Sequence, residues 1–559
     1  MPDKVKNDNS IDGLDINNEH TGKSNFPVWG SLAFFSGFCV LSYEILWGRM
    51  AKFLLGDRTI AITTLLFVFI LSLGLGSLVS GRLSRYYGFK TTKQAVKLIS
   101  WIFLISSLPH LAIIPLTLKT ISGQGLYQIL PFDNIFIRRV IIIWILILPP
   151  ITFLGIAFPY LLQSAKDLDK IPGKIAGKLY LINTFGAVLG AIFINWVCIR
   201  WIGTIGGFIF IIGVMVVFSF ITILFVYAPN RRRIAVIMAL VIFTVSALNY
   251  QYKMVFLNKG ETLITENEDE YGIQSLVSTE RNYLRVRNNR IQLIYDLGHW
   301  QTSHAQQMAA HLPILFAGDY EHVLNIGTGY GITAGAFTLY PEIKSIETIE
   351  ILPFLVQNQN KFKDYNYSYF NDPRVSLIQG DGRNYLFKSK KEYDIISVNV
   401  LDPYLPGSSS LYTVDFWELA KRCLRPGGVF TQLFWGNDVP LLVKGLLKVF
   451  PTVLCFPAYG DTAYNIVAFT SPVNKSGLNI HLERLVPEVL TNISKFTNVK
   501  PQQYLRQLTK GSWVISKILE VSASKIKGRR HTDNFPVLEY RWTHGVKGIS
   551  IFDTPMVKQ

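Results

Sequence analysis

Cysteine is scarce in this chain, with four among 559 residues, and acidic side chains are nearly absent between residues 28 and 249. The cysteines stand apart from one another, at Cys39, Cys198, Cys423 and Cys455. No two of them have the spacing of metal ligands or of a disulfide pair, so they predict no metal site and leave the redox compartment open. The polar first segment lacks the short apolar core of a signal peptide, and we expect residues 1–27 to be a disordered tail.

The rest of the chain is unusually apolar. Hydrophobic residues make up 49% of it, which is too many for an ordinary soluble enzyme. The excess is concentrated in residues 28–249, whereas the remainder has the mixed composition of a globular domain. The formal net charge of +17 comes largely from short loops between apolar runs and from the far C-terminus. This arrangement favours a lipid bilayer with anionic headgroups as the partner, and we expect no nucleic acid.

Six apolar runs have about the 20 residues that a helix needs to cross a bilayer. They cover residues 28–48, 60–81, 96–117, 139–163, 179–199 and 205–228. A seventh run, over residues 234–250, is at the lower limit of length. We therefore predict a multi-pass α-helical membrane bundle of six or seven helices over residues 28–250, located in the cell (inner) membrane.

Basic residues alternate between the loops and predict the orientation of the bundle. The loops after the second, fourth and sixth runs are rich in Lys and Arg, whereas the loop after the fifth has only Arg200. The N-terminus is therefore predicted to be cytoplasmic. Six spans place the C-terminal domain in the cytoplasm and seven place it outside, and the sequence leaves this choice open.

Small residues and one acid stand out within the apolar runs. Gly173-Lys-Ile-Ala-Gly177 and Gly186-Ala-Val-Leu-Gly190 have the spacing that lets helices approach closely, and we expect packing rather than transport. Glu44 lies inside or at the rim of the first run, where a charge is costly without a partner. An ion pair, with Arg49 or with another helix, and a substrate or proton site are both open for Glu44.

The periodicity changes in the second half of the chain. Short alternating runs near residues 262–265, 274–278, 283–287 and 292–295 are separated by turn residues. They predict a small antiparallel β unit over residues 255–312.

Strands then alternate with helical segments. The strands are expected near residues 323–326, 345–351, 375–379, 394–399, 429–434, 452–456 and 466–470. This alternation predicts a doubly wound, mainly parallel, methyltransferase-like (Rossmann-like) sheet over residues 313–475. Residues 476–559 are expected to be a C-terminal extension.

Polar motifs follow three successive strands of this sheet. In Gly327-Thr-Gly-Tyr-Gly331 the missing side chains let a ligand approach the backbone. Glu350 ends the second strand, where a carboxylate can accept hydrogen bonds from both ribose hydroxyls. Asp381 ends the third strand, positioned to receive an adenine amino group. Because ligands of such sheets lie at the carboxyl ends of the strands, the motifs together predict an adenosyl nucleoside.

Each acid also has a structural alternative. Asp381 is a candidate helix cap, and Glu350 is a candidate for an ordinary surface salt bridge. The predicted nucleoside-binding set is Gly327, Gly329, Gly331, Glu350, Asp381 and Gly382.

At these residues the chain resembles the polyamine aminopropyltransferases, the spermidine and spermine synthases, and it looks closest to their membrane-fused relatives. Tyr271-Gly-Ile-Gln274 is similar to a Tyr-Gln element of the family's β domain, which makes Gln274 a cofactor-binding candidate. Further matching blocks in the soluble half are Asp372-Pro-Arg-Val375, Gly380-Asp-Gly-Arg-Asn-Tyr385, Ser410-Leu-Tyr-Thr413, Phe416-Trp-Glu-Leu419 and Arg425-Pro-Gly-Gly428. Segments 180–190 and 532–540 match the fused relatives, so the resemblance spans nearly the whole chain.

The resemblance implies a reaction. An aminopropyl group is transferred from decarboxylated S-adenosylmethionine to an amine such as a polyamine, and methylthioadenosine is released. This chemistry needs a carboxylate near the amine, both to hold a cationic polyamine and to remove a proton before attack. The resemblance leaves the oligomeric state open, a homodimer included.

Several acids of the family's amine site are replaced in this chain. Tyr330, a candidate substrate contact, stands where the family has an Asp that binds the cofactor amine. Asn399 stands at the position of the family's proton acceptor. Asp402 is retained as a candidate base and substrate ligand, with a turn residue as its alternative. The family's Tyr-His-Glu segment is shortened here, with Gln306 and Gln307 near the expected His and Glu, and His304 is a candidate substitute in substrate binding. The nucleoside half of the site is thus retained while the amine half is changed, which predicts a changed second substrate.

Three functions follow from these observations. The first is a membrane-anchored transferase that uses decarboxylated or intact S-adenosylmethionine. The second is a non-catalytic or divergent S-adenosyl nucleoside-binding domain, a methyltransferase included, that regulates a membrane bundle. The third is a transporter-type bundle with a soluble partner domain, which lacks support because the spans have little ionisable content beyond Glu44. We favour the first.

Overall fold

The computed structural model divides the chain into two compact units, one of residues 1–51 and 62–254 and the other of residues 52–61 and 255–559. The predicted seventh run over residues 234–250 and the candidate base Asp402 lie outside the described residues. The structure describes residues 18–55, 59–86, 92–121, 135–165, 171–226, 257–289, 291–292, 296–400, 408–435, 439–459, 463–473, 480–496, 500–503, 505–506, 509, 512, 516 and 531–532.

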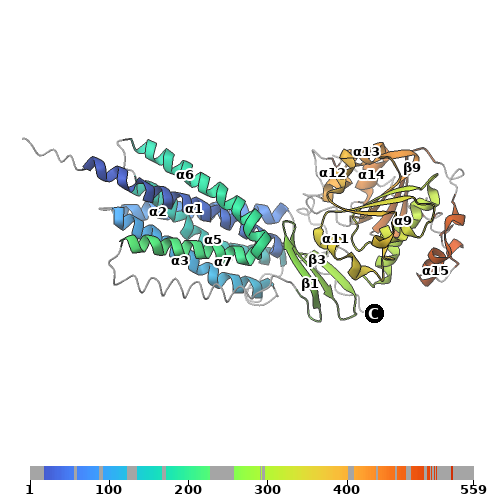
Figure 1. The fold of residues 1–559 in the computed structure, drawn as a ribbon, viewed down its shortest axis with the longest axis horizontal. Helices are drawn as coiled ribbons and strands as arrows, with labels where there is room; N and C mark the ends of the chain where they lie inside the picture. The colour runs from blue at the N-terminus through green and yellow to red at the C-terminus, as the bar shows by residue number, and fades with distance from the viewer. Residues whose placement is uncertain are drawn as a thin grey trace, which may run out of the picture. The chain divides into compact units, whose positions relative to one another are not determined.

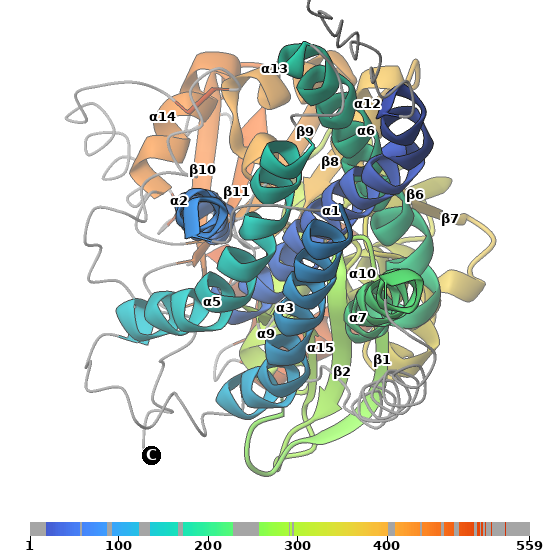
Figure 2. The ribbon, with the colours of Figure 1, turned by 90° about the vertical axis from the view of Figure 1, so that its left-hand side faces the viewer.

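The first unit is a bundle of long helices that lie side by side (Figure 1 and Figure 2). These helices fall at the six predicted apolar runs. Their bounds are α1 Asn18–Leu55, α2 Thr59–Tyr86, α3 Thr92–Ile121, α5 Ile135–Ser164, α6 Pro172–Phe193, the π-helical turn η2 Ile194–Cys198, and α7 Ile199–Val226.

Four helical segments of this unit are long and apolar enough to cross a membrane. The last of them contains Gly203, whose backbone is non-helical at φ 72° and ψ 179°. This break lies where the fifth and sixth predicted runs meet. The four segments are Phe26–Leu55, Ala61–Tyr86, Ile137–Ser164 and Pro172–Phe220.

Helix α1 begins earlier than the sequence predicts. It starts at Asn18, so the expected disorder does not hold for residues 18–27. Pro27 lies inside the helix, and its carbonyl accepts a hydrogen bond from Ser31 Oγ at 2.9 Å. A helix that is already nucleated in the apolar run extends cheaply into polar residues of ordinary helix propensity.

Glycines bring α1 and α6 into backbone contact. A Cβ added at Gly186 would lie 2.1 Å from the Phe34 carbonyl oxygen, and one at Gly190 would lie 2.4 Å from that of Phe38. This confirms the predicted packing role of the Gly186 and Gly190 pair. A Cβ at Gly173 would meet nothing within 4 Å, so the other motif makes no such contact with the described residues.

Glu44, the acid of the first run, forms no ion pair with Arg49 in the described part of the bundle. Arg49 Nε instead donates to Thr204 Oγ1 at 2.9 Å. Among the residues that the structure describes, no cation lies within salt-bridge distance of Glu44, which is half-buried on α1.

The second unit begins with the small antiparallel sheet that the sequence predicts. Its strands pair in the order β1-β2-β3-β4, each antiparallel to the next. Their bounds are β1 Thr262–Asp269, β2 Gly272–Ser278, β3 Leu284–Asn288 and β4 Ile291–Gln292.

A seven-stranded sheet follows in the order β10-β11-β9-β8-β5-β6-β7. Strands β5 to β9 are parallel to one another, and β11 is antiparallel to both β9 and β10. This confirms the doubly wound, mainly parallel, methyltransferase-like architecture. The strands are β5 His322–Ile326, β6 Ser345–Glu350, β7 Val375–Gln379, β8 Tyr393–Val398, β9 Leu424–Trp435, β10 Thr452–Tyr459 and β11 Ala463–Phe469.

Helices cover both faces of the large sheet. Val323 and Leu324 of β5 point to opposite faces, and each joins a separate buried apolar cluster. The Val323 cluster includes side chains of α9 and α10, and the Leu324 cluster includes those of α12, α13 and α14. The helices of this unit are α9 Trp300–Phe316, α10 Ile332–Thr338, α11 Pro353–Gln357, α12 Gly382–Lys388, α13 Val414–Arg422, α14 Val439–Val449 and α15 Pro487–Phe496.

Candidate functional site

The glycine turn after β5 has a backbone that only glycine adopts without strain. Gly327, Gly329 and Gly331 have φ values of 83°, 55° and 84°. A Cβ added at Gly331 would also lie 2.4 Å from Tyr369 Cε1. The turn therefore depends on all three glycines for its shape, as the sequence pattern suggests.

Glu350, at the end of β6, holds this turn from the side. Its Oε2 accepts a hydrogen bond from the Gly329 backbone N–H at 2.9 Å, and its Oε1 accepts one from the Leu352 N–H at 3.0 Å. The carboxylate is buried, and burial raises the pKa of Glu350 although these backbone N–H donors favour the ionised form. The surface salt bridge that was its alternative is not formed with any described residue. Backbone hydrogen bonds from Ile351 and Thr328 also favour the ionised form, and ribose binding by Glu350 stays a prediction.

Two amides fix the carbonyls of the same turn. Gln359 Nε2 donates to the Gly329 carbonyl at 2.8 Å, and Asn366 Nδ2 donates to the Tyr330 carbonyl at 3.1 Å. Both amides are buried. The turn is consequently held in place through its N–H and its C=O groups before any ligand binds.

Asp381 caps helix α12 at the carboxyl end of β7. Its Oδ1 accepts a hydrogen bond from the Asn384 backbone N–H at 2.8 Å, and its side chain is exposed. Adjacent Gly382 is required for close packing, because a Cβ there would lie 2.3 Å from Ile326 Cγ2. The structural alternative for Asp381 is therefore present, and adenine binding stays a prediction.

Gln274, on β2, has a fixed amide with one unused oxygen. Its side chain is fully buried, and its Nε2 donates to Asp269 Oδ1 at 2.8 Å. Its Oε1 is buried without a hydrogen-bond partner among the described residues. A buried acceptor of this kind is costly unless a ligand or water donates to it, which fits the predicted cofactor-binding role.

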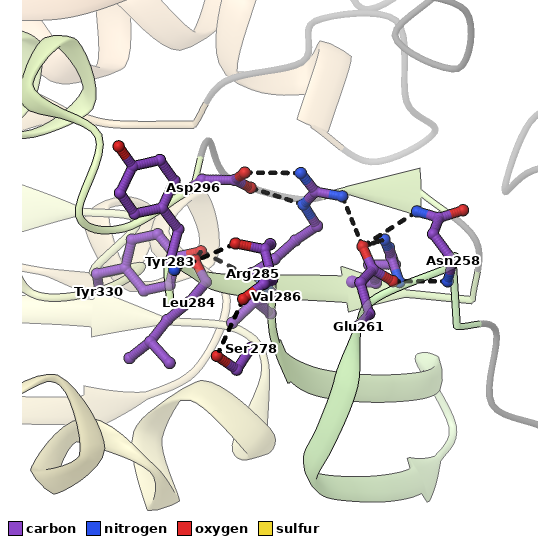
Figure 3. Close-up of polar contacts among 11 residues, drawn as sticks. Asn258, Glu261, Ser278, Tyr283, Leu284, Arg285, Val286, Asp296 and Tyr330 are labelled. Atoms are coloured by element: carbon purple, nitrogen blue, oxygen red, sulfur yellow. Dashed lines mark hydrogen bonds and ion pairs between the residues drawn. The ribbon is translucent and has the colours of Figure 1, made fainter. Parts of the chain in front are cut away.

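The side chain of Tyr330 ties the glycine turn to the small sheet (Figure 3). It is fully buried in an apolar cluster, and its hydroxyl accepts a hydrogen bond from the Val286 N–H at 3.2 Å and donates to the Leu284 carbonyl at 3.3 Å. Burial raises the pKa of this phenol. Tyr330 thus has a structural contact where a substrate ligand was expected, and direct substrate contact stays a prediction.

A partly buried ionic network fixes strand β3, which contacts this tyrosine (Figure 3). Arg285 on β3 donates to both carboxylate oxygens of Asp296 at 2.6 Å, and its Nη1 lies 2.7 Å from Glu261. Arg287 donates to Glu261 as well, at 2.7 Å. Burial opposes ionisation of Glu261, but hydrogen bonds from Arg287 and Asn258 hold its pKa below its usual range. The bidentate geometry gives β3 a fixed position against the turn.

Asn399 follows β8 and belongs to a buried polar network. Its Nδ2 donates to Asn325 Oδ1 at 2.8 Å and to Ser397 Oγ at 3.0 Å. Asn325 Nδ2 donates in turn to Thr348 Oγ1 at 2.9 Å, which is 2.6 Å from Thr328 Oγ1. The Asn399 Oδ1 is buried without a hydrogen-bond partner among the described residues. An amide cannot take a proton at this position, but its oriented oxygen can accept a hydrogen bond.

His304 lies near the start of α9 and is only 8% exposed. Burial lowers its pKa to about 4, so the imidazole is neutral at pH 7. A neutral imidazole is able to accept a proton, but its low pKa makes it a weak base. The substrate role predicted for His304 stays a prediction.

Sequence reasoning missed several groups that shape this site. Gln359 and Asn366 were overlooked because their partners are backbone carbonyls of a distant turn. Asn325 offered a signal, since a polar residue interrupts the apolar strand β5. Within the described ranges no group of three His, Cys, Asp or Glu side chains could hold a metal ion.

Comparisons with known proteins agree with this arrangement. Residues 303–446 match the spermine/spermidine synthase domain. Polyamine aminopropyltransferases of Shigella sonnei (strain Ss046) and Escherichia coli (strain K12 / DH10B) are each 36% identical over 125 residues, which is 22% of this chain and 43% of each relative. The chain therefore aligns with less than half the length of these curated relatives.

Solved structures of lower identity are also similar. A spermidine synthase in complex with the transition state analogue AdoDATO is 17% identical, with a TM-score of 0.39 over 47% of this chain and 89% of that one. The spermidine synthase from Thermotoga maritima is 17% identical, with a TM-score of 0.36 over 46% and 88%. The sequence matches show that residues 303–446 are similar to the spermine/spermidine synthase domain and to part of the polyamine aminopropyltransferases.

Proposed function

We propose that this protein is a membrane-anchored transferase that moves an aminopropyl group from decarboxylated S-adenosylmethionine to an amine acceptor. The observation that supports this most is the glycine turn, whose Gly329 N–H is bonded to buried Glu350 and whose Gly329 carbonyl is bonded to Gln359. A turn fixed in this way, next to a buried carboxylate, suits a ribose and an adenosyl sulfonium. The apolar helices of the first unit supply the anchor.

The reaction requires little covalent work from the protein. The acceptor nitrogen attacks the propyl carbon next to the sulfonium, the carbon–sulfur bond breaks, and its electron pair returns to sulfur as methylthioadenosine leaves. One proton leaves the nitrogen. The protein must therefore hold the nucleoside, align the amine and receive that proton. Asp402 is our candidate for the proton, because Asn399 cannot take it.

A second function is favoured by one observation. The amide Asn399 follows β8 with its Nδ2 committed to Asn325 and Ser397. A site without a carboxylate here suits an S-adenosyl nucleoside-binding domain, or a methyltransferase, better than a polyamine synthase.

Product analysis separates the two functions. The full chain in detergent or nanodiscs is incubated with decarboxylated or intact S-adenosylmethionine and putrescine, and the nucleoside product is identified by mass spectrometry. We expect methylthioadenosine from the decarboxylated cofactor. S-adenosylhomocysteine from the intact cofactor would support a methyltransferase, and no product from either would support a binding domain.

A further inference from the structure

Three buried oxygens without partners lie on one face of the large sheet, beneath α9. They are Thr431 Oγ1 on β9, Asn465 Oδ1 on β11 and Asn399 Oδ1 after β8, and none has a hydrogen-bond partner in the described part of the chain. Thr431 and Asn465 are each 1% exposed. Buried polar atoms are nearly always bonded in folded proteins, so three together call for a common explanation.

The strand register places the three side chains on one face of three neighbouring strands. Ser397 of β8 is paired with Thr431, and Asn465 is paired with Leu433, two residues further along β9. Side chains two residues apart on a strand share a face, so Asn399 and Asn465 flank β9 on the face that carries Thr431. Asn465 Nδ2 donates to the Ala305 carbonyl of α9 at 3.1 Å, which identifies this as the face that α9 covers.

The hydrogen-bond partners define how the two amides are oriented in the structure. The nitrogen of Asn399 donates to Asn325 and Ser397, and the nitrogen of Asn465 donates to the Ala305 carbonyl. Turning the Asn465 amide over would bring its oxygen against that carbonyl, whereas Asn399 could turn only together with Asn325. In this arrangement both oxygens are acceptors, and a ligand that satisfies them must donate N–H or O–H groups.

The charge of the surroundings narrows the ligand further. The described groups of this cluster are amides and hydroxyls, and nearby His304 is neutral at pH 7 because burial lowers its pKa to about 4. None of the cluster's described members is a carboxylate. A cation buried against uncharged groups is strongly disfavoured, whereas a neutral donor is not.

We propose that Asn399, Thr431 and Asn465 form an acceptor subsite that binds an uncharged hydrogen-bond donor of the second substrate, a hydroxyl or a neutral amine. This inference rests on the proposed transferase function and specifies the substrate class of its site. Hydrogen bonds through N–H leave the lone pair of an amine available for attack on the aminopropyl carbon.

The selectivity test uses three probes of equal chain length. Putrescine, 4-amino-1-butanol and 1,4-butanediol are titrated calorimetrically into the full chain saturated with methylthioadenosine. We expect 4-amino-1-butanol or 1,4-butanediol to bind at least as tightly as putrescine. Putrescine binding about 10-fold more tightly than both, or no binding by any probe, would overturn the subsite. If methylthioadenosine itself does not bind, the proposed function fails first.

A near-isosteric variant tests whether the cluster is merely structural. Thr431→Val removes a buried oxygen that lacks a partner, so we expect an unchanged or higher melting temperature together with roughly 10-fold weaker probe binding. The matched control is Thr452→Val on β10, whose hydroxyl donates to the Val473 carbonyl at 3.3 Å. The control should melt at a lower temperature and bind the probes normally. Normal probe binding by Thr431→Val would overturn the proposal.

Discussion

The site has a predicted nucleoside half, formed by the glycine turn and Glu350, and a proposed acceptor half, formed by Asn399, Thr431 and Asn465. The two halves differ in how many of their polar atoms have hydrogen-bond partners. In the nucleoside half, the Gly329 N–H and carbonyl are bonded to Glu350 and Gln359. In the acceptor half, Asn399, Thr431 and Asn465 each leave a buried oxygen without a partner in the described structure. The glycine turn of the first half is bonded before its ligand arrives, whereas we propose that the ligand completes the second half. Under the proposed function, this difference means that the nucleoside site is retained while the second substrate has changed.

Restoring an acid in the acceptor half should give the largest effect. In Asn399→Asp the polar network can reverse its donors: Asn325 Nδ2 donates to the new carboxylate, Thr348 donates to Asn325, and Thr328 donates to Thr348. Ser397 can donate to the carboxylate too. A general base contributes about 100-fold or more to a rate, so we expect methylthioadenosine release with putrescine to rise by about that factor.

The control for this variant is Asn371→Asp, which adds the same charge at an exposed position. Its rate should equal that of the wild type. If Asn399→Asp binds methylthioadenosine normally but turns over no faster than the control, the position does not face the acceptor.

Removing the acid of the nucleoside half should be nearly as severe. Glu350→Ala loses the carboxylate that positions Gly329 and that we expect to receive the ribose hydroxyls. Hydrogen bonds to a charged group contribute about 1.5–3 kcal/mol each, so methylthioadenosine affinity should fall by about 50-fold in calorimetry. Glu483→Ala, at an exposed acid, should bind normally. An unchanged affinity in Glu350→Ala would place the nucleoside elsewhere.

Acidification should destabilise the protein because the buried imidazole of His304 must take up a proton when the chain unfolds. The folded-state pKa of His304 is about 4, below its ordinary value of 6.5, so the unfolded chain binds more protons between these values. Stability from this group is present above pH 6.5 and is lost as the pH falls towards 4. We expect a loss of about 2 kcal/mol across that window.

Denaturant unfolding of the wild type and His304→Gln is measured at several pH values. The difference between their free energies of unfolding gives the contribution of His304. The variant should lose less stability on acidification than the wild type. His481→Gln, at a half-exposed histidine, serves as the comparison. Equal slopes in the wild type and His304→Gln would show that His304 is not buried in its neutral form.

Removing the Tyr330 hydroxyl, which links the small sheet to the glycine turn, should have the smallest effect on methylthioadenosine affinity. Tyr330→Phe keeps the ring but removes the hydrogen bonds with Val286 and Leu284. A net hydrogen bond contributes about 1 kcal/mol, so we expect methylthioadenosine binding to weaken by about fivefold at most. Tyr340→Phe loses a buried bond to His311 Nδ1 and should reduce stability without this change in affinity. Equal affinities in both variants would remove Tyr330 from the positioning of the turn.

The sequence predicts the nucleoside half better than the acceptor half for a physical reason. The glycine turn and Glu350 lie at the ends of adjacent strands, and a positive φ requires glycine, so local pattern and strand order are enough to identify them. Asn465 comes near Asn399 only because β11 inserts antiparallel beside β9. The periodicity of the sequence predicts neither the position of β11 in the sheet nor the orientation of an amide side chain.

The large elements were predictable for similar reasons. Apolar runs of membrane length and alternating strands identify the helices of the first unit and both sheets of the second. The start of α1 at Asn18 was missed because helix propagation into polar residues leaves no apolar pattern. The tether made by Tyr330 was missed because a tyrosine after a glycine turn gives no sign of the strand that its hydroxyl contacts.

The central claim is that the nucleoside half is an intact adenosyl site, and titration of the full chain with methylthioadenosine tests it most directly. Calorimetry in detergent or nanodiscs, with wild type and Glu350→Ala measured side by side, is sufficient. We predict saturable binding by the wild type at one site per chain and a loss of about 50-fold in the variant. Absence of binding by a folded wild-type protein would contradict the account.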